Sequence, residues 1–175
     1  MNTPLRLQRF TQQGEGLHVW SEVEASAEAV KLYSLCNSAY PAGEEELRKV
    51  VLKDILNTAF RFAVHARRVL EFEGDHTSQV VETGTDNHLA RYYSETFSFE
   101  KNLRKAINKI IHARKIAILM DRGEMRGNEV LQFDKADMVV AFEIQSDQGE
   151  AFHVVPQGVA WGYLLRGQTA EKGTA

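Results

Sequence analysis

The segment 44–73 constrains the fold of this chain more than any other part of the sequence. Its first three residues are glutamates, which suit the positive end of a helix dipole, and Gly74 follows it as a typical C-terminal stop. The segment therefore predicts a long central helix with one buried face. Phe60 and Val64 fall on another side, so we expect its second half to be covered from two directions. The residues that recur at helical spacing on the predicted buried face are Leu47, Val51, Ile55, Phe62, Ala66 and Val69.

A second amphipathic segment follows at 99–119. Ser98 is a suitable N-cap, Glu100 lies in the expected first turn, and an Asp-Arg-Gly sequence at 121–123 would end the helix. The pattern predicts a second long helix, antiparallel to the first. On a helical wheel at about 100° per residue, one side collects Leu103, Ala106, Ile107, Ile110, Ala117 and Ile118.

The other N-terminal and connecting segments carry weaker patterns. Residues 17–24 alternate weakly, which predicts a short strand or an extended arm. Ser26 is an N-cap candidate for a short helix over 26–37, and the Tyr-Pro-Ala-Gly sequence that follows at 40–43 breaks the chain. The polar stretch 74–87 predicts a loop, and 88–95 predicts a short helix.

The periodicity changes from helical to alternating near residue 128. Residues 129–133 and 138–145 read as strands, and Ser-Asp-Gln-Gly at 146–149 is a turn that leads into a pairing strand at 150–155. Pro156 ends this ladder because proline has no backbone N–H to donate. We expect the segment that holds Trp161 and Tyr163 to pack on the body of the fold.

Helices first and strands last predict the α+β class. We expect a helical core of two long antiparallel helices plus shorter helices, followed by a C-terminal antiparallel β-hairpin or three-stranded meander. The length of 175 residues fits a single domain over 1–165, with the helical core at about 26–120 and the hairpin at about 128–156. Residues 166–175 predict a disordered tail.

Composition and charge exclude several classes of protein. The net charge of −3 argues against a general nucleic-acid coat, which would be clearly basic, although a local basic surface stays compatible with it. No apolar run approaches the roughly 20 residues of a membrane span. The single Cys36 has no partner for an internal disulfide, and we expect a buried thiol in a cytoplasmic protein.

The polar side of the 99–119 segment is the candidate site. Lys101, Lys105, Asn108 and His112 share that side, with Lys109 and Lys115 flanking it. Asn108 lies one turn below His112, where its side chain could hydrogen-bond the imidazole ring. A neutral imidazole among lysines can bind a phosphate and take a proton from an adjacent hydroxyl. Cleavage of RNA through its own 2′-hydroxyl requires those two abilities and no metal.

A plainer interpretation is that a lysine stripe opposite an isoleucine stripe is a solvated helix face. A His-Ala-Arg-basic tetrapeptide occurs at 65–68 as well as at 112–115, and we attribute the first occurrence to chance, with His65 as a partly buried structural histidine. The carboxylates near His76 lack a second histidine or cysteine at ligand spacing, so we expect no metal site and no cofactor.

The sequence Asn-Lys-Ile-Ile-His-Ala at 108–113 resembles the HEPN superfamily, whose members are helical domains of toxins, defence systems and RNA-processing enzymes. Asn108 and His112 match the polar residue and the histidine of the family motif. Ile107 stands where the family has its arginine, Arg104 is one residue too far from the histidine, and Lys105 has the spacing without the guanidinium. The resemblance covers about 43–119 and implies a homodimer whose two motifs line one basic cleft.

Two functional hypotheses follow from these residues. In the first, the chain is a HEPN-like protein that binds RNA or cleaves it without metal. His112 would be the acid/base, Asn108 would orient it, and Arg104 would hold the phosphate, with Lys101, Lys105 and Lys115 binding nucleic acid. In the second, the chain is a non-catalytic homodimeric interaction or adaptor protein of a defence or mobile-element system, and the basic stripe faces solvent or an acidic partner.

Overall fold

The computed structural model describes residues 14–74, 97, 99–124, 135–146, 149 and 151–166. The predicted α+β class is confirmed, with two long helices and a C-terminal antiparallel sheet. The elements in chain order are α1 (Gly14–Cys36), β1 (Ala39–Pro41), α2 (Glu45–Glu73), α4 (Leu103–Ile111), β2 (Lys115–Glu124), β3 (Lys135–Gln145), β4 (Ala151–Val154) and α5 (Pro156–Leu165).

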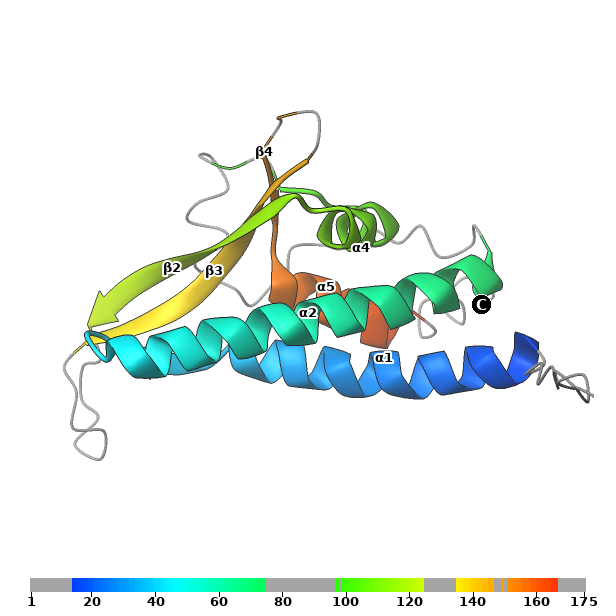
Figure 1. Ribbon diagram of the computed structural model, residues 1–175, viewed down its shortest axis with the longest axis horizontal. Coiled ribbons are helices and arrows are strands. Elements are labelled where there is room, and N and C mark those ends of the chain that lie inside the picture. Colours follow the sequence, from blue (N-terminus) through cyan, green and yellow to red (C-terminus); the bar gives the residue numbers. More distant parts are fainter. Residues whose placement is uncertain are drawn as a thin grey trace, which may run out of the picture.

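The two long helices, α1 and α2, form an antiparallel hairpin (Figure 1). Their opposite ends meet where the ring of His18 stacks on that of Phe72, with 4.1 Å between ring centroids. Near the middle, Arg61 on α2 lies 2.8 Å from the carboxylate of Glu28 on α1. The predicted central helix is thus confirmed as α2, and its glutamate-rich start and Gly74 stop lie where the sequence placed them.

The sheet is built around β3. Strand β2 pairs antiparallel along one edge of β3, from Lys115 opposite Gln145 to Glu124 opposite Lys135. The other edge of β3 carries β1 at one end and β4 at the other. One face of the sheet joins the helical core, because Phe142, Ile144 and Val154 are buried in the same cluster as the helices.

Helix α5 joins the sheet to the long helices. Pro156 starts it, which suits proline because the first N–H groups of a helix have no partner within it. Inside, the side-chain amide of Gln157 donates to the backbone oxygens of Cys36 and Val139, each at 2.8 Å. The packing expected for residues 159–165 is confirmed, and Tyr163 is fully buried there. Burial also raises the pKa of the Cys36 thiol, as expected for a structural cysteine.

The expectation of a strand or arm at 17–24 followed by a short helix at 26–37 is wrong, because α1 is continuous through both. Its buried face consists largely of small side chains, Ser21, Ala25 and Ala29, followed by Leu32 and Cys36. Such a face gives almost no hydrophobic contrast at helical spacing, although its residues are fully covered.

The predicted long helix at 99–119 is also wrong in its second half. Helix α4 stops at Ile111, and the chain enters β2 at Lys115, so the second long helix is α1. Residues 116–120 are a continuous apolar run, which fits a buried strand or a buried helix equally well. Pairing with β3 decides between them, beginning with the Arg114 N–H, which donates to the oxygen of Gln145 at 3.0 Å.

The predicted strands at 138–145 and 150–155 are confirmed as parts of β3 and β4. The chain break expected at 40–43 holds a short strand, β1, at its start. The predicted loop over 74–87, helix over 88–95 and strand over 129–133 lie outside the described residues, apart from Gly74. The expected covering of Phe60 and Val64 is wrong, because these side chains are 38% and 49% exposed.

Candidate functional site

Helix α4 carries the candidate histidine at its C-terminal end. Its N-cap is Asn102, whose Oδ1 accepts a hydrogen bond from the Lys105 N–H at 3.0 Å. Its C-cap is His112, whose backbone N–H donates to the oxygen of Asn108 at 3.0 Å. The predicted buried face of this helix is confirmed by the four residues Leu103, Ala106, Ile107 and Ile110, all fully buried.

His112 meets an arginine from another helix. The ring is exposed, and its Nε2 lies 3.0 Å from Nη1 of Arg67 on α2. The Nε of Arg67 donates to the Glu71 carboxylate at 2.7 Å. A guanidinium can only donate, so Nε2 must accept. The ring proton of neutral His112 therefore belongs on Nδ1, which leaves that N–H as its donor to a ligand.

Arg67 belongs to the first His-Ala-Arg tetrapeptide, which we had attributed to chance. The structure brings the two tetrapeptides into contact through Arg67 and His112. His65 itself faces α1, where its ring makes a T-shaped contact with Trp20 at 4.8 Å. Burial lowers the pKa of His65, against the opposing effect of nearby Glu24. The structural role expected for His65 therefore fits its surroundings, and Arg67 is the residue that the sequence reasoning missed.

Asn108 does not orient the His112 ring in the way we expected. The hydrogen bond between the two residues joins their backbones. The side-chain Oδ1 of Asn108 is buried and accepts no hydrogen bond within the described part of the chain. Arg67, rather than Asn108, fixes the ring. The exposed polar stripe expected along α4 is thus interrupted at Asn108.

The predicted basic residues do not all lie on α4. Lys101 precedes the helix, and both Lys101 and Lys105 are exposed, whereas Arg104 is only partly exposed. Lys115 lies in β2, outside the helix on which we had placed it. Lys109, one of the flanking lysines of α4, is 20% exposed and sits over the ring of Phe152. Its charge also faces Glu100 at 3.8 Å.

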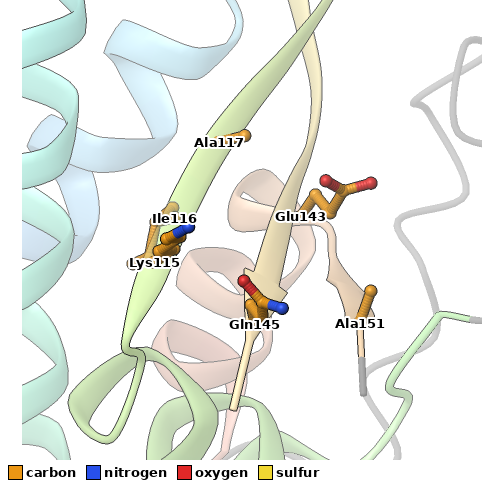
Figure 2. A pocket seen from close by; sticks show the side chains of 6 residues that line it. All are labelled: Lys115, Ile116, Ala117, Glu143, Gln145 and Ala151. Atoms are coloured by element: carbon orange, nitrogen blue, oxygen red, sulfur yellow. The ribbon is translucent and has the colours of Figure 1, made fainter. Parts of the chain in front are cut away.

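A groove opens on the exposed face of the sheet just beyond His112. Figure 2 shows one part of it, a pocket of about 470 Å³ lined by Lys115, Ile116, Ala117, Glu143, Gln145 and Ala151. A second pocket of about 270 Å³ shares Lys115 and Gln145 with the first. Its other lining residues are Arg114, Ser146 and Gly149. The two pockets adjoin at these shared residues, and we call them together the sheet groove.

Among the described residues, no group of three or more histidine, cysteine, aspartate or glutamate side chains could hold a metal ion. Within the same residues, the helices are all too short or too polar to cross a membrane.

Comparison of the chain with protein-family models gives no match, and neither the curated proteins nor the solved structures give one. The resemblance to the HEPN superfamily therefore rests on Asn108, His112 and their neighbours in the sequence. The site is defined by its own geometry, in which an exposed histidine and a partly exposed arginine from two helices meet beside the cationic end of a groove.

Proposed function

We propose that the protein binds single-stranded RNA through a phosphate held between Arg67 and His112. The observation that carries the proposal is the 3.0 Å contact between Arg67 Nη1 and His112 Nε2 on the protein surface. The Arg67 side chain is 36% exposed, and its contacts with described residues use only Nε and Nη1. Its Nη2 group and the Nδ1–H of His112 are donors suited to phosphate oxygens.

The surroundings of this pair supply further positive charge. Lys101 is exposed just before α4 and Lys105 is exposed on it, and Arg114 and Lys115 are exposed where α4 passes into β2. Such a surface attracts a polyanion although the whole chain is slightly acidic. The resemblance to HEPN proteins selects RNA among the polyanions.

Cleavage is a further step of the same proposal. When Arg67 turns from His112 to a bound phosphate, Nε2 regains its lone pair and accepts the proton of a neighbouring 2′-hydroxyl. The freed oxygen attacks the adjacent phosphorus to form a 2′,3′-cyclic phosphate, the P–O5′ bond breaks, and the 5′-oxygen leaves with a proton taken from water. Arg67 stabilises the charge that develops on the phosphate. This route requires no metal, so it continues in the presence of a chelator.

Replacing either member of the Arg67–His112 pair should weaken RNA binding. We expect Arg67→Ala or His112→Ala to raise the Kd for a short single-stranded RNA roughly tenfold, which is about 1.4 kcal/mol. A plot of the logarithm of the association constant against the logarithm of the salt concentration has a negative slope. For Arg67→Ala this slope should become less steep by about one, because one phosphate contact is lost. Fluorescence anisotropy over a salt series measures both quantities. The same RNA incubated with chelator tests for cleavage by the wild type and its loss in His112→Ala.

Arg61→Ala is the matched control, because Arg61 lies on the same helix but pairs with Glu28 on α1. It should leave the RNA affinity within about twofold of the wild type, since a surface charge far from bound phosphate contributes little. Equal affinities for the wild type and both site variants would overturn the proposal.

A second candidate function, a homodimeric interaction protein, is favoured by apolar side chains on the surface of α1. Val19, Val23 and Val30 are between 55% and 62% exposed, and their spacing of four and seven keeps them on one side of the helix. We call these three residues the α1 stripe. Exposed apolar surface of this kind marks interaction sites. In a two-fold dimer the same stripe of each copy would pack against the other.

The α1 stripe predicts that Val23→Glu converts a dimer into a monomer, because a carboxylate would be buried in the contact. Val50→Glu is the matched control, since Val50 is 60% exposed and lies on α2. Light scattering coupled to size-exclusion chromatography gives the mass of each variant. A monomeric wild type, or the same mass for Val23→Glu as for the wild type, would remove this candidate.

A further inference from the structure

The sheet groove begins two residues after His112. Consecutive Cα atoms are 3.8 Å apart, so the Cα atoms of His112 and Arg114 lie within about 7.6 Å of each other. Arg114 is tied to the sheet by its backbone bond to Gln145, and Lys115 lies opposite Gln145 in the ladder. Residues adjoining the proposed phosphate site therefore also line the groove.

The residues on the floor of the groove are set by the way side chains alternate between the two faces of the sheet along each strand. Lys115 and Ala117 on β2, Glu143 and Gln145 on β3, and Ala151 on β4 project from the same face of the sheet. Ala117 lies opposite Glu143, and Ala151 lies opposite Gln145. The small alanine side chains beside long polar ones leave the hollow that Figure 2 shows.

The two ends of the groove carry opposite charge. Arg114 and Lys115 form the cationic end, which suits a phosphate. Glu143 lies at the other end and, as a carboxylate, can only accept hydrogen bonds. Between them, the Gln145 amide both donates and accepts. The matching ligand has an anionic group at one end and N–H donors at the other.

His153 lies beside Glu143 on the neighbouring strand. Its Nε2 is 3.5 Å from the Glu143 carboxylate, and its ring stacks on Phe97 with 4.4 Å between centroids. The His153 side chain is only 12% exposed, whereas that of Glu143 is 46% exposed. A largely covered ring thus flanks the more exposed carboxylate that lines the groove.

We infer that the sheet groove is a nucleotide subsite that binds one cytidine nucleotide of the RNA, an inference that rests on the proposed function for its choice of ligand. Arg114 and Lys115 hold the phosphate, and Glu143 accepts a hydrogen bond from the N4 amino group of the base, as carboxylates do in cytosine recognition. The volumes of about 470 and 270 Å³ suit a ligand of this size.

Titration of the full chain with 5′-CMP, 5′-UMP and inorganic phosphate, followed by amide chemical shifts, tests the inference. We expect CMP to shift the amides of Lys115, Ala117 and Gln145 and to bind roughly tenfold more tightly than UMP, whose carbonyl O4 would face the Glu143 carboxylate. Phosphate alone should shift only the cationic end. No shift of these amides at millimolar CMP, or equal affinities for CMP and UMP, would overturn it.

Two variants separate the ends of the groove. Lys115→Glu should lower CMP affinity at least tenfold, while Glu143→Ala should abolish the preference for CMP over UMP and leave phosphate binding unchanged. Lys135→Glu is the charge-matched control, because Lys135 is exposed at the opposite end of β3, about 33 Å from Gln145 at 3.3 Å per residue. A loss of CMP binding in Lys135→Glu equal to that in Lys115→Glu would contradict a site at the groove.

Different experimental results would overturn the nucleotide subsite and the proposed function. If His112→Ala leaves RNA affinity unchanged but CMP still shifts the groove amides, the proposed function is overturned and the groove stands as a mononucleotide site. If RNA affinity depends on His112 but CMP shifts nothing in the groove, the subsite alone is overturned.

Discussion

Replacing Phe62 with alanine should cost about 3–5 kcal/mol of unfolding free energy, the range found for deleting a buried phenyl ring. Phe62 is fully buried on α2, and its ring packs edge-on against Tyr163 of α5 with 5.4 Å between centroids. The substitution removes apolar burial and leaves a cavity where three helices share one core. Because whole domains are stable by only about 5–15 kcal/mol, the loss should be large enough to shift the urea midpoint strongly.

Phe72→Ala is the control for this prediction, since it makes the same substitution on the same helix where the ring is 59% exposed. It should cost no more than about 1 kcal/mol, including its stacking contact with His18. The two variants are compared by urea unfolding monitored by circular dichroism. Equal losses would show that the buried face of α2 is not centred on Phe62.

The sequence predicted α2 well because its apolar and polar faces contrast strongly and its ends carry clear start and stop residues. The prediction for α1 was wrong because the side chains on its buried face are small and partly polar, with Ser21 and Ala25 in the place of large apolar residues. The prediction for β2 was wrong because an apolar run has no period of its own. That strand is decided by pairing with β3, which is a tertiary contact.

For the candidate site, too, the sequence predicted some features and missed others. Local spacing correctly put the isoleucines of α4 in the core and His112 at the surface. It could not show that Arg67, 45 positions earlier, reaches the His112 ring, because that contact depends on how α2 packs against α4. The only sequence sign was the repeated His-Ala-Arg tetrapeptide. The sheet groove was equally hidden, since it needs the register of three strands.

Arg166, the last described residue, is the second position at which we expect a substitution to lower the unfolding free energy strongly. We expected the disordered tail to begin at this position, yet its side chain is only 10% exposed and bridges two long helices. Its guanidinium donates to Glu73 of α2 at 3.1 Å and to Glu22 of α1 at 2.9 Å. It also lies over the Tyr163 ring, 4.1 Å from the centroid. Residues 167–175 lie outside the described part of the chain.

Arg166→Met should therefore lower the unfolding free energy by about 2–3 kcal/mol. Breaking a fully buried ion pair costs about 3–5 kcal/mol, and the cost is smaller here because the carboxylates of Glu22 and Glu73 remain partly exposed. Methionine keeps most of the apolar stem, so the change isolates the loss of charge and hydrogen bonds. Urea unfolding at low and high salt measures it, and the effect should persist in salt because a partly buried pair is poorly screened.

A double-mutant cycle with Glu73→Gln identifies the contact responsible. If Arg166 acts through Glu73, the double variant should lose less free energy than the two single variants together, since neither partner is then left with an unpaired charge. Arg61→Met is the matched control, because its guanidinium pairs with Glu28 while 62% of the side chain stays exposed. It should cost less than about 1 kcal/mol. Additive losses in the cycle would show that Arg166 stabilises the helices through packing on Tyr163 rather than through its charge.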